Sequence, residues 1–492
     1  MIDWLFARAQ THPNHPFLLF HDGRQITFAE MNEQVATRAY QLAKQGIVAG
    51  DVIGLRINDQ LEFVRSALAV MRLNATIVPL NLRLTASELA WQVENAGCKL
   101  VLRDGVFPIG DLQIQMVNVT KLPKLSGEVA LTPYLKHKYQ ADSAFAIIHT
   151  SGTSGKPKGA LLTFDNIRYS ARASEHRLGV FPDDCWLCIL PLYHIGGLSI
   201  IMRSLLYGTS VMLYPRFDVE TINDLLTNQP VTLVSLVPTM LRRLIDAREG
   251  AWHDKLRLVL LGGAAPSQEL VSTCIDLNIP VATTYGLSEA SSQVATTLPT
   301  ETIQKPKSVG KAVLYTSVRV ADEKGETVPA GEVGEILVTG KTVFREYINA
   351  PEATAKTLIN GELHTGDMGY VDADGDLFIV NRRSDLIVSG GENVYPAEVE
   401  AIIRKHPAVH EVVVVGVDDE EWGQKVACVI VLEDGMTVTE TEISDYAKNQ
   451  LAGYKRPRMM RFVDELPLTA SGKIQRGEVR EMMNKIGKTD IG

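Results

Sequence analysis

Apolar and polar positions along the first half of the chain alternate between two patterns. Short apolar runs at residues 52–55, 75–80 and 99–102 are typical of buried strands. Between them, apolar residues recur every three or four positions, as in Leu61, Val64 and Leu68, which is typical of amphipathic helices. Strands that alternate with helices in this way form βαβ units. The pattern therefore predicts an α/β fold built on parallel sheets.

Two of the predicted helices begin with a capping box, in which a threonine is followed three residues later by a glutamate. Thr27 with Glu30 predicts a helix that reaches about residue 44, and Thr85 with Glu88 predicts one that reaches about residue 95. The same alternation returns later, with strands expected at 258–261 and 281–284 and a helix at 266–277.

The pattern changes after about residue 309. Short strands with glycine-rich turns are expected at 318–320, 334–338 and 377–380, which predicts a small β-barrel or a twisted sheet. The charged stretch 381–385 follows, and beyond it lies a separate α+β pattern. We therefore expect a large N-terminal domain at 1–381 and a small mobile C-terminal domain at 382–492, with a hinge near 382–385 and a cleft between the two.

Composition narrows the class of protein. The 492 residues are too many for one core, and 45% hydrophobic with 22% charged residues is ordinary for a globular protein. A net charge of −9 disfavours a nucleic-acid partner. Five scattered cysteines are typical of reduced thiols, and neither a signal peptide nor a membrane span is expected. These features predict a cytoplasmic location.

The stretch 150–159 combines glycines, hydroxyls and lysines directly after an apolar strand. Glycine lets backbone N–H groups approach an anion, and hydroxyls and lysines add donors and positive charge. The stretch does not match a Walker loop, because Thr150 stands where that motif needs its first glycine and Pro157 follows Lys156. We predict a loop that binds phosphates.

Further short motifs carry chemistry. His194 lies between a proline and two glycines at a strand-to-helix turn, where it could gate a pocket. Tyr285 and Glu289 follow a parallel strand, where open α/β sheets bind ligands. Asp367 offers a carboxylate to ribose hydroxyls, and Lys473 lies on a flexible loop near the C-terminus. A zinc site formed by Cys185, Cys188 and His194 is disfavoured against buried thiols, because only one such cysteine pair is present.

Taken together and in order, these motifs resemble those of the adenylate-forming superfamily, which includes acyl- and aryl-CoA synthetases, luciferases and peptide-synthetase adenylation domains. The matching stretches cover nearly the whole chain: 150–159, 191–197, 262–265, 285–289, 334–340 with Tyr347, 365–367, 382–396 and 453–476. A member of this family activates a carboxylate with ATP and Mg²⁺ through an acyl-adenylate and then transfers the acyl group to a thiol.

The resemblance also implies roles for individual residues. The β- and γ-phosphates of ATP would be covered by Thr150, Ser151, Gly152, Thr153, Ser154, Gly155 and Lys156. The adenine would contact Gly263, Ala264, Ala265, Tyr285 and Gly286. Ser288 would approach the α-phosphate, Glu289 and Thr150 would hold Mg²⁺, and Asp367 and Arg382 would bind the ribose. Lys473 would carry the adenylation step.

The second step would follow a rotation of the C-terminal domain. In the family this rotation withdraws the lysine, here Lys473, and presents a glycine loop, here with Ser389, Gly390 and Gly391, to the pantetheine of CoA. Lys455 is expected either to contact CoA phosphates or to be a solvated lysine. The hinge position appears in this sequence as Ser384. A homodimer is common in similar enzymes.

The carboxylate is indicated by a narrower resemblance. The stretches 190–199, 285–293 and 382–396 are similar to those of the o-succinylbenzoate–CoA ligases of menaquinone biosynthesis. Besides His194, the residues expected to read the second carboxylate of such a substrate are Arg203, Ser291, Ser292 and Gln293. Two alternatives stay open: another aryl- or fatty-acyl-CoA synthetase, and a nucleotide-binding protein without catalysis.

Overall fold

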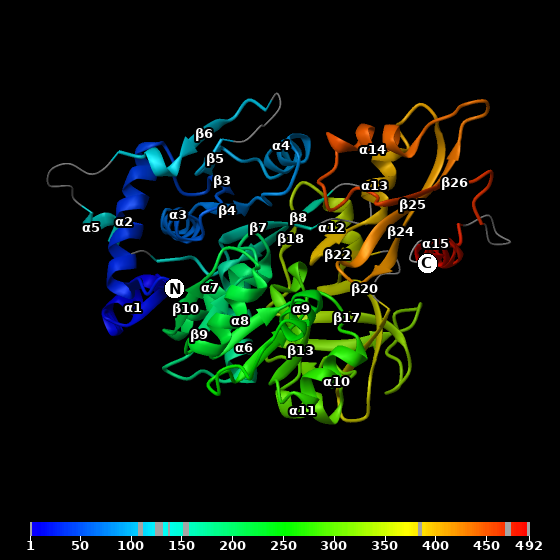
Figure 1. Ribbon diagram of the computed structural model, residues 1–492. Coiled ribbons are helices and arrows are strands. Elements are labelled where there is room, and N and C mark those ends of the chain that lie inside the picture. The colour runs from blue at the N-terminus through cyan, green and yellow to red at the C-terminus, as the bar shows by residue number, and fades with distance from the viewer. Residues whose placement is uncertain are drawn as a thin grey trace.

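The computed structural model describes residues 2–106, 112–123, 131–135, 138–150, 157–381, 386–467 and 474–489. Two large, mostly parallel sheets with their helices form the N-terminal part, and a smaller α+β unit follows at the C-terminal end (Figure 1). The predicted α/β fold is confirmed. No helix among these ranges combines the length and apolar character that crossing a membrane requires.

The first sheet has the order β18-β8-β7-β4-β3-β5-β6. Its central strands β3 to β7 pair in parallel, and β8 pairs antiparallel with β7. The strands are β3 (Val52–Arg56), β4 (Thr76–Pro79), β5 (Leu100–Arg103), β6 (Gln115–Asn118), β7 (Ala144–Thr150), β8 (Lys158–Thr163) and β18 (Glu346–Tyr347). The helices among these strands are α2 (Phe28–Lys44), α3 (Gln60–Arg72), α4 (Ala86–Asn95), α5 (Thr132–Leu135) and α6 (Phe164–Leu178), with a short 3-10 turn η1 (Val119–Lys121).

The second sheet has nine strands in the order β15-β14-β13-β12-β11-β9-β10-β1-β2. They are β1 (Pro16–Phe20), β2 (Gln25–Thr27), β9 (Cys185–Cys188), β10 (Ser210–Leu213), β11 (Leu233–Leu236), β12 (Leu258–Leu261), β13 (Val281–Leu287), β14 (Ser292–Thr296) and β15 (Lys311–Ala312). Its helices are α1 (Trp4–Thr11), α7 (Ile195–Tyr207), α8 (Val219–Asn228), α9 (Pro238–Asp246), α10 (Gln268–Asp276) and α11 (Pro299–Gln304), with a 3-10 turn η2 (Ser288–Ala290). One buried apolar cluster includes side chains from both sheets and from α2, α3, α6 and α7, so the two sheets share a core.

The region expected to form a small barrel or twisted sheet is a five-stranded antiparallel sheet. Its order is β16-β17-β20-β19, and β21 also pairs with β20. No pairing among the described strands joins its edges, so the sheet is open along these strands. Its elements are β16 (Thr316–Ala321), β17 (Gly334–Gly340), α12 (Pro351–Thr357), β19 (Leu358–Ile359), β20 (Glu362–Val371) and β21 (Leu377–Asn381).

The C-terminal unit has its own sheet, in which every described strand pairs only within the unit. Its elements are β22 (Ile387–Ser389), β23 (Glu392–Val394), α13 (Pro396–Ile403), β24 (Val409–Asp419), β25 (Gly423–Leu432), α14 (Glu440–Lys448), β26 (Met459–Phe462) and α15 (Arg476–Thr489). The predicted hinge at 382–385 lies outside the described residues. A boundary at 381/382 therefore stays a proposal, which the separate sheet supports.

Candidate active site

A cavity of about 320 Å³ lies where the carboxyl ends of the parallel strands meet the C-terminal unit. Thr150 at the end of β7, Gly263 after β12 and the stretch 286–289 at the end of β13 contribute to its lining. The stretch 390–393 from the C-terminal unit completes it. The carboxyl ends of parallel strands are where open α/β sheets bind ligands, so the position agrees with the sequence-based expectation.

Glu289 contacts Thr150, the other residue predicted to hold Mg²⁺. The hydroxyl of Thr150 donates to Oε1 of Glu289 at 3.2 Å, and the hydroxyl of Tyr347 donates to the same oxygen at 2.6 Å. Both donors come from the first sheet, whereas Glu289 follows β13 of the second sheet. Thr150 and Glu289 both line the cavity, and a carboxylate beside a hydroxyl fits Mg²⁺, which prefers oxygen ligands and usually keeps water or phosphate in its coordination shell.

Asp367 and Tyr285 meet at the predicted ribose and adenine end. The hydroxyl of Tyr285 donates to Oδ2 of Asp367 at 2.6 Å. Asp367 lies on β20 and lines the cavity, whereas Tyr285 is buried behind it and is not part of the lining. Gly263 lines the cavity with a left-handed φ of +79°, but the neighbouring Ala264 and Ala265 lie outside the lining.

Arg203 is a buried cation in the wall of the cavity. Its side chain is 2% exposed and lines the cavity from α7. One amino group lies 3.4 Å from the hydroxyl of Ser292, the guanidinium lies 5.6 Å from the centre of the Trp186 ring, and Nε has no hydrogen-bond partner. Burial lowers the pKa of Arg203. Across the described part of the chain, no carboxylate oxygen lies within ion-pair distance of it.

The three residues predicted beside Arg203 differ in orientation. Ser292 and Gln293 line the cavity, and Oε1 of Gln293 is buried without a partner among the described residues. Ser291 is fully buried, and its hydroxyl donates to the carbonyl of Thr342 at 2.8 Å. Both Ser291 and Ser292 have a positive φ, 56° and 98°, which is costly for a residue other than glycine and persists where surrounding structure imposes it. The geometry therefore leaves Ser292 and Gln293 as the candidates for substrate contact.

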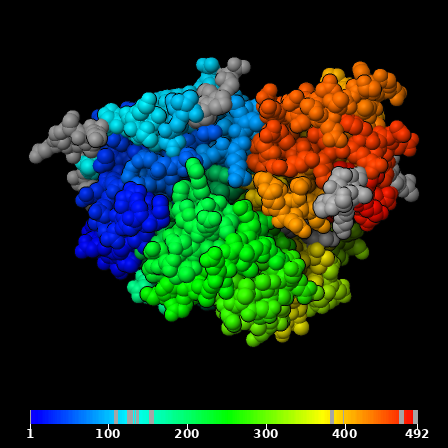
Figure 2. Space-filling model, in the orientation of Figure 1, coloured from blue at the N-terminus to red at the C-terminus, as the bar shows by residue number. Residues whose placement is uncertain are grey.

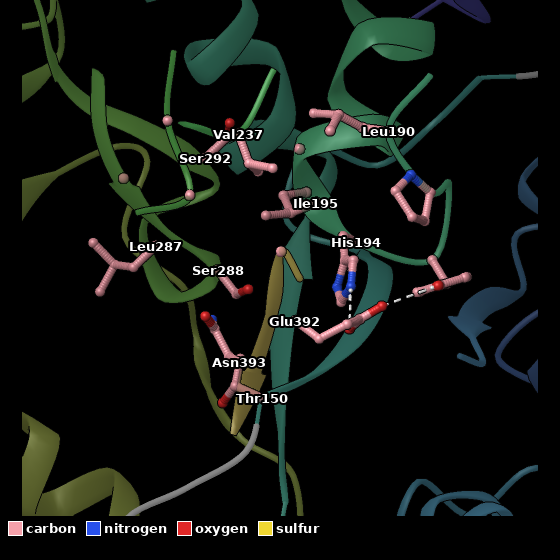
Figure 3. Close-up of a pocket in the computed structure, with 18 of the residues that line it drawn as sticks. Thr150, Leu190, His194, Ile195, Val237, Leu287, Ser288, Ser292, Glu392 and Asn393 are labelled. Carbon is pink, nitrogen blue, oxygen red and sulfur yellow. Dashed lines mark hydrogen bonds and ion pairs between the residues drawn. The ribbon is translucent and has the colours of Figure 1, made fainter. Parts of the chain in front are cut away.

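His194 contacts the C-terminal unit directly. Its Nε2 lies 3.0 Å from Oε2 of Glu392, as the dashed line in Figure 3 marks, and the hydroxyl of Tyr193 donates to Oε1 of Glu392 at 3.2 Å. Arg83 contributes an amino group 3.5 Å from the same Oε1. Burial alone would raise the pKa of Glu392, but His194, Arg83 and Tyr193 outweigh it and lower the pKa. Glu392 is therefore held as a carboxylate, and it ties the C-terminal unit to the N-terminal one.

The glycines before Glu392 bring the backbone of the C-terminal unit to the cavity. Gly390 and Gly391 have φ values of +59° and +83°, which glycine adopts at little cost, and both line the cavity. A Cβ on Gly391 would lie 3.4 Å from a side-chain carbon of Val237 at the start of α9. Ser389 is buried and does not line the cavity. The predicted loop thus reaches the cavity through its glycines.

Lys455 is buried between two glutamates. Its Nζ lies 2.7 Å from Oε1 of Glu88 and 2.7 Å from Oε1 of Glu398. It is therefore not the solvated lysine that was the alternative expectation. Its ammonium is paired with both carboxylates in this arrangement, and the contact with CoA phosphates stays a prediction.

Several predicted residues lie outside the described residues: Ser151, Gly152, Thr153, Ser154, Gly155, Lys156, Arg382 and Lys473. Their roles stay predictions. Cys185 and Cys188 are buried on β9, and burial raises the pKa of each thiol to about 12. Both are thus neutral thiols, as expected in preference to a zinc site.

Sequence reasoning missed the contacts that cross between the two units. Glu392 belongs to a stretch that we singled out, but nothing in the sequence links it to His194, Tyr193 or Arg83. Glu88 was noticed only as a capping residue. A cluster of polar side chains that the fold brings together from distant segments has no local pattern, so covariation between homologues is the signal that would have revealed it.

Comparison with known proteins shows which proteins this chain is similar to. The family model described as AMP-binding enzyme matches residues 5–348, and the model described as AMP-binding enzyme C-terminal domain matches residues 398–473. A 2–succinylbenzoate–CoA ligase from Geobacillus sp. (strain WCH70) is 38% identical over 483 residues, which are 98% of this chain and 97% of that protein.

Solved structures of o-succinylbenzoate CoA synthetase from Bacillus subtilis are also similar. A double mutant bound to a product analogue, OSB-NCoA, superposes with a TM-score of 0.92 at 36% identity, covering 98% of both chains. The complex with the acyl-adenylate OSB-AMP has a TM-score of 0.75 at the same identity and coverage. The complex with ATP and magnesium ion has a TM-score of 0.74 at 35% identity, covering 97% of this chain and 99% of that one.

These scores concern one enzyme at nearly equal identity and coverage, so their difference reflects how the parts of the molecule are arranged. The present chain shares the arrangement of the product-analogue complex more closely than that of the other two. The family models together cover most of the chain, and the named relative matches nearly all of it. The chain belongs to the AMP-binding enzyme family.

Proposed function

We propose that the protein is an ATP-dependent ligase that joins 2-succinylbenzoate to coenzyme A in menaquinone biosynthesis, releasing AMP and pyrophosphate. The full-length similarity to 2-succinylbenzoate–CoA ligases supports both the reaction and the substrate. The cavity supports it independently, because it combines a carboxylate suited to Mg²⁺, a carboxylate suited to ribose and a buried cation.

In the first half-reaction a carboxylate oxygen of the substrate attacks the α-phosphorus of ATP, and the bond to pyrophosphate breaks. The nucleophile is already ionised, so no general base is needed. The obstacle is repulsion between anions, which cations and N–H donors offset as charge builds up. Thr150 and Glu289 would hold Mg²⁺, which supplies positive charge next to the phosphates when bound. Asp367, fixed by Tyr285, would bind the ribose, and Lys473 would act at the reacting carboxylate.

In the second half-reaction the thiol sulfur of CoA attacks the acyl carbon, the bond to AMP breaks, and the thiol proton is lost. Gly390 and Gly391 would present their backbone to the thiol-bearing arm of CoA, because both line the cavity in a left-handed conformation that glycine adopts at little cost. The similarity to the product-analogue complex supports assigning the present arrangement to this step.

The observation that carries the substrate assignment is the unpaired guanidinium of Arg203. A cation that is 2% exposed and has no carboxylate partner in the described parts of the chain is unfavourable unless an anion joins it. A dicarboxylate supplies one carboxylate for activation and a second for Arg203, with Ser292 and Gln293 adding polar contacts. A fatty-acyl chain would offer nothing to this end of the cavity, so the fatty-acid alternative is disfavoured.

The test replaces Arg203 by methionine, which keeps much of the side-chain length without the charge. We expect Arg203→Met to raise KM for 2-succinylbenzoate by at least about tenfold, as for a lost charged hydrogen bond. Monocarboxylate analogues that lack one of the two carboxylates separate activation from recognition. For the analogue without the carboxylate that Arg203 binds, KM of Arg203→Met should stay within about twofold of KM of the parent protein for the same analogue. An unchanged KM for 2-succinylbenzoate would refute the assignment to Arg203.

The matched control is Arg248→Met. Arg248 also lies over a tryptophan ring, that of Trp252 at 5.4 Å, but outside the cavity lining. Its replacement should leave KM unchanged. Product analysis tests the reaction itself: AMP, pyrophosphate and a CoA thioester are expected, whereas ADP, or binding of ATP without turnover, would favour a phosphotransferase or a non-catalytic nucleotide-binding protein.

Two further elements belong to the proposal. A cytoplasmic location is supported by the five cysteines, all of which are free thiols in the structure. A homodimer follows only from similar enzymes, and light scattering of the purified protein would decide it.

A further inference from the structure

Three charged side chains meet in a buried position between the N-terminal and C-terminal units. Nζ of Lys455 lies 2.7 Å from a carboxylate oxygen of Glu88 and 2.7 Å from one of Glu398. The three side chains are only 3%, 8% and 7% exposed, respectively. Glu88 belongs to α4, whereas Lys455 and Glu398 belong to the C-terminal unit. The mechanism described above does not use this triad.

Glu88 is held in place by contacts within its own helix. It is the third residue of a capping box at the start of α4, and its Oε2 accepts hydrogen bonds from the backbone N–H and the hydroxyl of Thr85, both at 2.8 Å. The other oxygen, Oε1, is the one that faces Lys455. The capping box therefore holds a carboxylate at a set position on the surface that the C-terminal unit covers.

The C-terminal unit carries a charge arrangement that complements this carboxylate. Burial alone would lower the pKa of Lys455, but Glu398 and Glu88 outweigh it and raise the pKa, so the lysine is charged. Burial also raises the pKa of Glu398, whose Oε2 is buried without a partner among the described residues. If the C-terminal unit moved away, Lys455 would keep Glu398 and lose only Glu88.

Further contacts between the two units surround the triad. The hydroxyl of Ser87 lies 3.4 Å from the carbonyl of Asn449, and the amide of Asn81 lies 3.4 Å from the hydroxyl of Tyr454. In Figure 1 α4 lies beside α13 and α14, and in Figure 2 the blue surface around α4 abuts the orange surface of the C-terminal unit. One buried apolar cluster contains side chains from both sides.

We propose that Glu88 is a positioning residue for the CoA-dependent half-reaction: through Lys455 and Glu398 it holds the C-terminal unit in the arrangement that brings Gly390 and Gly391 to the cavity. Buried ion pairs contribute little net stability, because desolvation offsets their attraction, but breaking one is costly. Such a triad therefore selects one arrangement over others. The inference depends on the proposed function, because that function assigns this arrangement to thioester formation.

The test is Glu88→Gln, because glutamine also serves as the third residue of a capping box. The helix start is thus kept while the charge that faces Lys455 is removed. The two half-reactions are measured separately: pyrophosphate release from ATP and carboxylate without CoA, and thioester formation when CoA is mixed with preformed enzyme-bound acyl-adenylate. We expect roughly tenfold slower thioester formation, as for loss of a charged hydrogen bond, with pyrophosphate release within about twofold of the parent.

Glu30→Gln is the matched control. Glu30 occupies the same capping-box position in α2, where Thr27 donates to it, but it is exposed and remote from the C-terminal unit. Both half-reactions should be unchanged in this variant. A second variant, Lys455→Met, tests the link between the two residues. If Glu88 acts through Lys455, thioester formation in the Lys455→Met, Glu88→Gln double variant should be slower than in Lys455→Met alone by much less than tenfold.

The outcomes are distinguishable. If the parent protein releases no pyrophosphate with any carboxylate, the proposed function fails. If the parent completes both half-reactions but Glu88→Gln slows neither, or slows both equally, the positioning role is refuted. The same conclusion follows if the effects of Glu88→Gln and Lys455→Met multiply in the double variant.

Discussion

Nε2 of His194 and Oε2 of Glu392 lie 3.0 Å apart, although 198 residues separate them in the chain. Glu392 is 4% exposed, and it also accepts from Tyr193 and faces Arg83. Its carboxylate is thus the point at which the C-terminal unit is attached to the turn that precedes α7. That turn leads directly into the helix that carries Arg203, so this contact connects the C-terminal unit to the substrate end of the cavity.

The first prediction removes the charge of this contact. Glu392→Gln keeps the shape of the side chain but weakens three charged contacts, so the C-terminal unit should dock less well. We expect thioester formation from preformed acyl-adenylate to slow by at least about tenfold, and pyrophosphate release to change less. Rapid-quench measurement of each half-reaction checks this. Glu411→Gln, which removes an exposed ion pair with Arg404 inside the C-terminal unit, is the control and should change neither rate.

The second prediction concerns Mg²⁺. In assays of pyrophosphate release, Glu289→Gln should weaken the apparent affinity for Mg²⁺ by roughly 10- to 100-fold or more, because a carboxylate ligand is lost. Tyr347→Phe removes only the hydroxyl that orients the carboxylate, so its effect should be smaller. Titration of initial rates with Mg²⁺ gives both affinities. If the two variants bind Mg²⁺ as tightly as the parent, Glu289 is not a ligand.

Local patterns predicted most of the fold because local chemistry determines it. The capping boxes at Thr27 and Thr85 form as expected. Each helix begins at the residue after its capping threonine, and α2 and α4 end where predicted, at Lys44 and Asn95. The helix expected at 266–277 is shorter, spanning Gln268–Asp276, because Ser267 caps it with a hydrogen bond to the N–H of Leu270. The open edges of the five-stranded sheet depend on long-range pairing, which strand propensity does not specify.

The site was predicted in part for the same reason. Thr150 and Glu289 were both expected to hold Mg²⁺, and the hydroxyl of Thr150 lies 3.2 Å from Oε1 of Glu289. Ser291 was expected to face the substrate, but it ends η2 in a left-handed conformation with φ 56°, and its hydroxyl donates to the carbonyl of Thr342. Alternation along a strand does not apply to Ser291, because this residue lies in the turn between η2 and β14. The pairing of Lys455 with Glu88 depends on how two units dock, which no local pattern encodes.

The third prediction concerns stability away from the cavity. Nζ of Lys305 lies 2.6, 2.7 and 2.8 Å from carboxylate oxygens of Asp372, Asp374 and Asp376 in the turn between β20 and β21. Without this cation the three carboxylates repel one another, so Lys305→Met should lower Tm. Added salt should recover part of the loss, because salt screens the repulsion. Differential scanning calorimetry at low and high salt checks this, with Lys307→Met as the control at a neighbouring exposed lysine.

His149 provides a pH-dependent contribution to stability. It precedes Thr150 on β7, and neither of its ring nitrogens has a partner among the described residues. The edge of the Trp91 ring faces it at a centroid distance of 6.0 Å. Burial lowers the pKa of His149 to about 3. The folded protein therefore holds this imidazole neutral at pH values at which the unfolded chain binds a proton.

The fourth prediction follows from the direction of this shift. Well above pH 6.5 the imidazole is neutral in both states and contributes no pH dependence. As the pH falls from 6.5 toward about 3, only the unfolded chain takes up the proton, so the free energy of unfolding decreases. At pH 5.5 the loss is at most about 1.4 kcal/mol, the value of one pH unit.

His149→Phe removes this term, so its Tm should fall less than that of the parent between pH 7.5 and 5.5. His176→Phe, at an exposed histidine on α6, should keep the parent's pH dependence. Equal slopes for the parent and His149→Phe would show that the folded protein protonates His149 as readily as the unfolded chain does.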